Sequence, residues 1–290
     1  MAAPDPATDA APTLVTMGIS HYAEKARWAL QRYGLPFMEE AHAPGPHRFA
    51  CKAAGGRGSV PCLRLPPSAS SSGADGQRSS CVDESTPILR WVDQQAGQRA
   101  AAAGQPPPPP LFPAGPAGDQ VEQLVQRFDR QLGPAVRVWA YSHLLFTPAI
   151  AQAMVAPPVP AHERWLLRCG GWWVLRRLMV KAMGISPERG EKALTKIRGC
   201  FDDVAALLAD GRPFLAGSAF TAADLTFAAL SAPALGRAYG TAPGESSDTP
   251  PAMAAQLAEL RAHPAGQHAL RMWAEQRDVV LGPAAAGSKL

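Results

Sequence analysis

Charge is scarce in this sequence, and neither sign dominates. Of its 290 residues 18% are charged, and 28 basic against 24 acidic residues give a formal net charge of +4. Such a small, scattered excess argues against a partner recognised mainly by charge, such as a nucleic acid. Hydrophobic residues make up 47% of the chain. This is enough to build the cores of two globular domains.

The sequence also lacks the cysteine and histidine patterns of a disulfide framework or a zinc site. None of its five cysteines forms a C-x-x-C pair, and their odd number is more typical of free thiols in a reducing compartment. Cys62 and Cys81 are expected to be core residues on strands. No H-x-x-x-H spacing stands beside a carboxylate. We therefore expect no metal cofactor.

No hydrophobic run is long enough to cross a membrane without charges. The nearest segment, 165–184, carries four basic residues: Arg168, Arg176, Arg177 and Lys181. Its aromatic and basic residues would suit a membrane surface, but a core or cleft-lining helix with snorkelling arginines is the favoured interpretation. Trp172 and Trp173 could line a pocket for an apolar substrate, although such pairs more often belong to a core.

Both ends of the chain are predicted to be tails. Residues 1–11 contain no arginine and no apolar stretch, so they predict a disordered tail and not a signal or transit peptide. Residues 282–290 end in Ser288, Lys289 and Leu290, the peroxisomal import address. We therefore expect a peroxisomal protein bound by an import receptor, and otherwise a cytoplasmic one.

Proline and serine concentrate in two low-complexity stretches that divide the chain. The proline-rich region 99–118 predicts a linker without a packed element, and 68–80 predicts a flexible loop. The expected domains are therefore 12–98 and 119–281.

The first domain shows the order β-α-β and then β-β-α. Strands are predicted near 13–18, 37–40, 60–65 and 81–83. A first helix runs from His21 to about Tyr33 and stops at Gly34. Another starts within 84–95, with Ser85 as its N-cap.

The second domain has only helical patterns. Apolar stripes run through 121–132 and 194–208, and two short helices are expected near 252–262 and 265–279. Thr221 and Asp224, in FTAADL, have the spacing of a capping box. We assign Asp224 to folding and not to chemistry.

The stretch ISHYAEKARWAL, 19–30, places a serine at the start of the first helix. Ser20 can act there as an ordinary N-cap, which accepts a hydrogen bond from one of the free N–H groups of the first turn. The same position would also place a hydroxyl beside a ligand bound at the helix N-terminus.

These features together resemble the cytosolic glutathione transferase superfamily. Ser20 has the place of the first cysteine of glutaredoxins and omega-class transferases, and GRPFLAGSAFTAADL, 211–225, is similar to the signature of the helical domain. Val60-Pro61 resembles the cis-proline turn, and Glu84-Ser85 the glutamyl-binding pair. The resemblance implies an α/β thioredoxin-like N-terminal domain with a mixed four-stranded sheet, followed by an all-α helical bundle.

The resemblance also implies glutathione as co-substrate. The main chain of Val60 beside Pro61 would pair with the extended peptide, Ser85 would bind its γ-glutamyl carboxylate, and Glu84 would face its ammonium group. Ser20 would donate a hydrogen bond that stabilises the thiolate.

Two positions depart from the family pattern. Ala23 replaces the second redox cysteine, so dithiol chemistry is not expected. Ser59 replaces the lysine that often precedes V-P, and the candidates Arg48, Lys52 and Arg57 for binding the glycyl carboxylate remain unranked.

The predicted function is a homodimeric transferase that conjugates glutathione to a small apolar electrophile or reduces a hydroperoxide. The alternative is a glutathione-transferase-like carrier without turnover. Retention on immobilised glutathione without activity towards electrophiles would favour the carrier.

Overall fold

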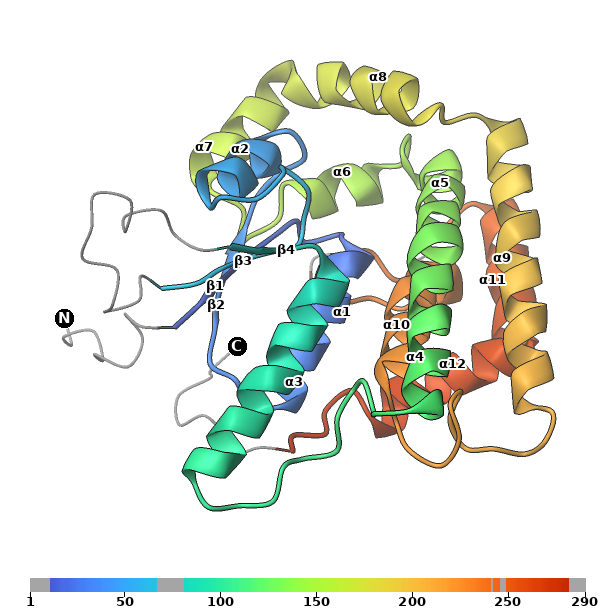
Figure 1. Ribbon diagram of the computed structural model, residues 1–290. Coiled ribbons are helices and arrows are strands. Elements are labelled where there is room, and N and C mark those ends of the chain that lie inside the picture. The colour runs from blue at the N-terminus through green and yellow to red at the C-terminus, as the bar shows by residue number, and fades with distance from the viewer. Residues whose placement is uncertain (1–10, 67–80, 241, 246–248, 282–290) are drawn as a thin grey trace.

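The computed structural model describes residues 11–66, 81–240, 242–245 and 249–281. The predicted loop at 68–80, the tail at 282–290 with its Ser288-Lys289-Leu290 end, and nearly all of the predicted tail at 1–11 lie outside the described residues. Within those ranges, a domain with a small sheet is followed by helices only (Figure 1).

The N-terminal domain is built on a mixed four-stranded sheet, as predicted. Its elements are β1 (Thr13–Thr16), α1 (His21–Arg32), β2 (Met38–Ala41), α2 (Pro46–Ala53), β3 (Cys62–Arg64), β4 (Cys81–Asp83) and α3 (Ser85–Ala102). The strand order is β2-β1-β3-β4, in which β1 and β2 are parallel and the other pairs are antiparallel. The sequence did not predict α2, because only Cys51 of its eight residues is buried and no apolar stripe results.

Two sequence predictions near α3 were wrong in detail. Ser85 is the first residue of α3 and not its cap, because Glu84 occupies the N-cap position. The proline-rich region 99–118, predicted to be a linker without packing, also contacts the rest of the protein. Leu111 is fully buried, and its N–H donates to Asp93 Oδ1 at 2.8 Å. The segment between α3 and the next helix therefore packs on the protein without being a helix or strand itself.

The second part of the chain is helical throughout its described residues, as predicted. Its elements are α4 (Pro116–Arg127), a π-helical turn η1 (Phe128–Leu132), α5 (Gly133–Leu144), α6 (Pro148–Met154), α7 (Ala161–Leu166), a second π-helical turn η2 (Leu167–Gly171), α8 (Trp172–Met183), α9 (Pro187–Leu208), α10 (Ala222–Ser231), a 3₁₀ turn η3 (Ala232–Leu235), α11 (Pro251–Ala262) and α12 (Pro264–Glu275). Helices α4, η1 and α5 follow one another directly, and the apolar stripe predicted for 121–132 lies in α4 and in the π-helical turn η1.

A buried capping box fixes the start of α10. Asp224 Oδ2 accepts from the Thr221 N–H at 3.0 Å, and its Oδ1 accepts from the Leu215 N–H at 2.8 Å. The Thr221 hydroxyl in turn accepts from the Ala223 N–H. The capping box predicted for FTAADL is confirmed, and Asp224, fully buried, serves the fold.

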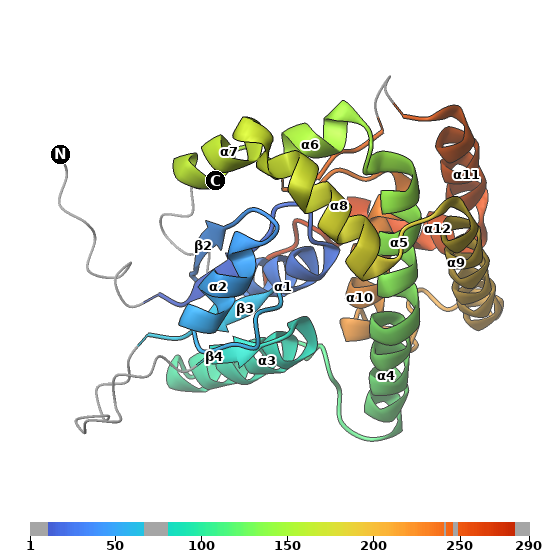
Figure 2. The same cartoon turned by 90° about the horizontal axis from the view of Figure 1, so that it is seen from above.

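Segment 165–184 forms two helices and not one. Gly170 has a φ of 100°, a conformation that suits glycine, and it bends the chain between α7 and α8. Helix α8 spans the distance between α7 and α9 (Figures 1 and 2). Trp172 packs against a small apolar cluster, whereas Trp173 is 53% exposed with Arg177 over its ring. No helix of the described ranges is long and apolar enough to span a bilayer.

Candidate functional site

A first cavity of about 540 Å³ lies between the sheet domain and the helices that follow it. Four residues that the sequence analysis assigned to glutathione line it together: Val60, Pro61, Glu84 and Ser85. Its opposite wall comes from α4 and η1, including Gln126 and Asp129. The structure therefore brings both predicted binding pairs into one pocket, although they are more than twenty residues apart in the sequence.

The Val60-Pro61 peptide bond is cis, as predicted. Val60 lies two residues before the start of β3, at the edge of the cavity. No hydrogen bond between described residues uses the N–H or C=O of Val60. Both groups are therefore available to pair with an extended peptide as an added strand.

Glu84 and Ser85 connect β4 to α3 in a restrained conformation. Glu84 has a φ of 72° and is the only non-glycine residue with positive φ in the described ranges. Its N–H donates to the Pro61 carbonyl at 3.2 Å, which ties it to the cis-proline turn. Ser85 is 4% exposed at the first turn of α3, where N–H groups are free to bind an anion. A positive φ at a non-glycine residue, as at Glu84, is typical of functional sites.

A buried charge cluster supports the wall of this cavity. Lys25 Nζ, fully buried, donates to both carboxylate oxygens of Asp129, at 2.8 and 2.9 Å, and to the Thr86 hydroxyl at 2.7 Å. Burial lowers the pKa of Lys25, while the Asp129 carboxylate opposes that shift. The cluster joins α1, α3 and η1. Sequence reasoning missed it, because no local pattern pairs residues about a hundred positions apart.

A second cavity, of about 580 Å³, adjoins the first. Ser20 lines it at the N-terminus of α1, and its walls are mostly apolar. Leu175, Leu178 and Met179 of α8 form one side. This confirms that the 165–184 segment lines a cleft, although neither Trp172 nor Trp173 is among the lining residues. Volumes of this size are typical of pockets for small molecules.

Ser20 is the N-cap of α1, and its hydroxyl keeps a free proton. Its Oγ accepts from the Ala23 N–H at 3.2 Å, so the cap predicted from the sequence is confirmed. No described residue accepts a hydrogen bond from the Ser20 hydroxyl. The same side chain can thus cap the helix and donate to a ligand atom in the cavity, where it is 7% exposed.

The two residues after Ser20 are engaged in holding the domains together. His21 Nε2 donates to the Gly133 carbonyl at 3.1 Å, and the Tyr22 hydroxyl donates to the Asp129 carbonyl at 2.7 Å. Burial and the nearby Arg137 lower the pKa of His21 to about 3, despite that hydrogen bond. His21 is therefore neutral at physiological pH and not placed to act as a general base for Ser20.

Four residues line both cavities: Tyr22, Ser59, Val60 and Arg137. They mark the place where the predicted glutathione pocket opens into the apolar one. Sequence reasoning did not single out Arg137, because it lies in the helical domain and its pattern is that of an ordinary exposed helix residue. Of the three candidates for the glycyl carboxylate, Arg48 alone lines a cavity, the second one.

The match to known proteins follows the same division of the chain. Residues 14–100 match the family model of the glutathione S-transferase N-terminal domain. Apart from Thr13, the matched residues hold the whole sheet, and they include the four residues predicted to bind glutathione, so the similarity covers the first cavity's side of the N-terminal domain. No curated protein sequence matches it.

Solved glutathione transferases share the whole fold with this chain. A glutathione S-transferase of Ceriporiopsis subvermispora in complex with glutathione has a TM-score of 0.55 at 18% identity, and the match covers 95% of this chain and 100% of that one. A family member from Pseudomonas fluorescens with two glutathione bound has a TM-score of 0.55 at 13% identity, with 93% and 92% covered. Glutathione transferase F2 of Populus trichocarpa gives 0.51 at 16% identity, with 90% and 98% covered. Such distant similarity establishes the fold.

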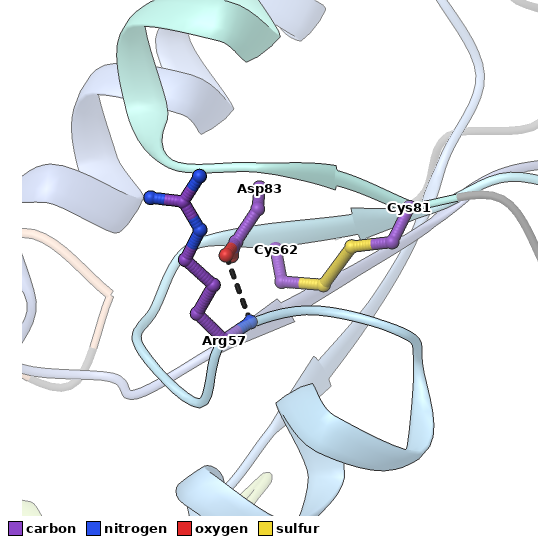
Figure 3. The surroundings of a disulfide bond; sticks show 4 residues. All are labelled: Arg57, Cys62, Cys81 and Asp83. Atoms are coloured by element: carbon purple, nitrogen blue, oxygen red, sulfur yellow. Dashed lines mark hydrogen bonds between the residues drawn. A yellow bond between two sulfur atoms is a disulfide. The ribbon is translucent and has the colours of Figure 1, made fainter.

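In this glutathione transferase fold, a disulfide joins the two strands that adjoin the residues predicted to bind glutathione. Cys62 of β3 and Cys81 of β4 are bonded to each other (Figure 3), so the expectation that all five cysteines are free thiols was wrong for these two. The two cysteines are diagonal neighbours on antiparallel strands, which the sequence could not show without the register. Asp83 lies beside them, and its Oδ2 accepts from the Arg57 N–H at 2.8 Å.

The same three side chains are the one cluster of metal-ligating atoms within the described residues. The sulfurs of Cys62 and Cys81 and a carboxylate oxygen of Asp83 lie within 4.8 Å of one another. Because the sulfurs are bonded to each other, neither offers a thiolate to a metal ion in this form.

Proposed function

We propose that this protein binds glutathione in the first cavity, activates its thiol beside Ser20 and transfers the sulfur to an apolar electrophile held in the second cavity. The observation that carries the proposal is the junction of the two cavities at the N-terminus of α1. The predicted peptide-binding residues line one cavity, and Ser20 lines the other. The glutathione bound in two structures of the same fold supports the choice of ligand.

The first cavity offers groups for each charged end of the γ-glutamyl moiety. The free N–H groups of the first turn of α3 and the Ser85 hydroxyl would bind its carboxylate. Glu84, whose side chain is 58% exposed, would face the ammonium group. The main chain of Val60 would hold the cysteinyl residue as an added strand and direct its sulfur towards the junction.

At the junction the thiol loses its proton to solvent, and the thiolate is stabilised by the Ser20 hydroxyl and the positive end of the α1 dipole. In conjugation, the thiolate electron pair forms the new S–C bond, while the electrophile releases its leaving group or takes up a proton. In the peroxidase variant, the thiolate attacks the O–O bond and gives an alcohol and a sulfenic acid. A second glutathione then converts the sulfenic acid to glutathione disulfide and water.

Two measurements test this function. Calorimetry should show glutathione binding that Ser85→Ala weakens by about 1–3 kcal/mol, the size expected for a hydrogen bond to a charged group. Turnover should then be measured with a panel of electrophiles and with cumene hydroperoxide. Binding without any turnover would support the carrier alternative, and absence of binding would contradict both functions.

We also propose that the protein is a homodimer, as the family resemblance implies. Sedimentation equilibrium would measure its mass in solution directly. A monomer at micromolar concentration would contradict this part of the proposal and leave the glutathione site unaffected.

A further inference from the structure

The second cavity combines apolar walls with positive charge. Arginines from three separate parts of the fold line it: Arg48 of α2, Arg137 of α5 and Arg237, which follows η3. Among the described residues, no aspartate or glutamate lines the cavity. A cavity lined by one sign of charge, with walls of low dielectric, concentrates ligands of the opposite sign.

None of the three guanidinium groups is neutralised within the part of the chain that the structure describes. No ion pair or side-chain hydrogen bond of Arg48 or Arg137 occurs there, and Arg237 contacts the ring of Trp273 at 5.1 Å but no carboxylate. Some other arginines in the described ranges have carboxylate partners, as Arg198 has with Glu259, and others such as Arg168 have none. What distinguishes the second cavity is that three such unpaired cations line it together and no described aspartate or glutamate does.

We propose that the acceptor substrate is an apolar molecule carrying a carboxylate or similar anionic group, which Arg237 and Arg48 recognise. The inference rests on the proposed function, because it assigns the second cavity to the acceptor. The apolar walls formed by Leu175, Leu178 and Met179 would hold the body of the molecule, and the guanidinium groups would fix its anionic end. Arg137, which borders the glutathione cavity, would raise the local positive potential at the reacting sulfur.

Binding of a matched acid and amide tests the inference without depending on turnover. Displacement of anilinonaphthalene sulfonate by decanoate and by decanamide should be followed on the protein saturated with S-methylglutathione, an unreactive analogue. We expect decanoate to bind about tenfold more tightly than decanamide at low ionic strength, and high salt should reduce this preference. Equal affinities for the acid and the amide would overturn the proposal.

Variants show which cations are responsible. Arg237→Gln should weaken decanoate binding about three- to fivefold, the size expected for a partly exposed ion pair, and leave decanamide binding unchanged. Arg237→Lys should keep most of the preference, and Arg48→Gln should behave like Arg237→Gln. Arg168→Gln, an exposed arginine outside both cavities, is the matched control. Loss of S-methylglutathione affinity in Arg237→Gln and Arg48→Gln, with decanoate binding intact, would assign these arginines to the peptide and overturn the proposal.

The two proposals can fail separately. If S-methylglutathione does not bind, the proposed function fails, and decanoate and decanamide can still be compared on the free protein. If S-methylglutathione binds and the acid is not preferred, the function stands and the anionic acceptor is wrong.

Discussion

A histidine and two glutamates connect the sheet domain to α7, and their connection should depend on pH. His42 Nδ1 lies 2.6 Å from Glu163 Oε1, and its Nε2 lies 2.9 Å from Glu40 Oε1. The Ala43 N–H donates to Glu163 Oε2 at 2.8 Å, so Glu163 is bound twice. Burial disfavours the charged imidazole, but the hydrogen bonds to Glu163 and Glu40 outweigh burial and raise the pKa of His42.

The raised pKa of His42 determines how its contribution to stability changes with pH. Because the pKa of His42 is raised in the folded state, its contribution to stability is fully present below the unfolded value of about 6.5 and is lost as pH rises through the folded value. His42→Gln replaces the cation by a neutral amide. It should reduce the free energy of unfolding by about 2–3 kcal/mol near pH 6, as for a charge-assisted hydrogen bond with a side chain that is only 11% exposed. Near pH 9 the free energies of unfolding of the protein and of His42→Gln should differ by less than about 1 kcal/mol.

Urea unfolding followed by far-ultraviolet circular dichroism measures this difference. The control is His162→Gln, because His162 is 82% exposed and 3.9 Å from the same glutamate, so it should change stability little at any pH. A difference between the protein and His42→Gln that is the same at both pH values would contradict the raised pKa of His42. So would an equal effect of the control variant.

Three further perturbations follow from the site. Asp129→Asn leaves the Lys25 ammonium buried without its carboxylate and should cost about 3 kcal/mol of stability in urea unfolding; a loss below about 1 kcal/mol would contradict the buried pair. Thiol alkylation of the denatured, unreduced protein should leave Cys62 and Cys81 unlabelled, and prior reduction should make both reactive. In the native protein Cys169, which is exposed, should label fastest, and early labelling of the buried free thiols would contradict the fold.

The fold could be predicted because its signals are local. A β-branched run ending at Gly18, Ser20 before an apolar-periodic helix, and the Thr221–Asp224 capping box each involve a few neighbouring residues. Helix α2 was missed, since its buried face amounts to Cys51 alone. The cap of α3 was misplaced because Glu84 adopts a positive φ, which sequence patterns do not predict for glutamate.

The predicted residues of the first cavity were found only because the resemblance named them. Val60, Pro61, Glu84 and Ser85 do line one cavity, although their roles towards glutathione stay predictions. Arg137 could not be found in this way, because its place beside the α1 N-terminus depends on how the two domains pack. The Cys62–Cys81 bond depends on strand register in the same sense, since residues nineteen positions apart meet only through the β3–β4 pairing.

The proposed activation of glutathione is tested most directly by the pKa of the glutathione thiol bound to the protein, measured from the ultraviolet absorbance of the thiolate as pH is varied. If Ser20 stabilises the thiolate, the bound pKa lies at least about one unit below the free value of about 8.5 and rises by about one unit in Ser20→Ala, equivalent to about 1.4 kcal/mol. Loss of the helix cap by itself would lower stability by about 1 kcal/mol and leave the thiol unchanged. A bound thiol with the same pKa in both proteins would make Ser20 a helix cap only and contradict the proposed activation of glutathione.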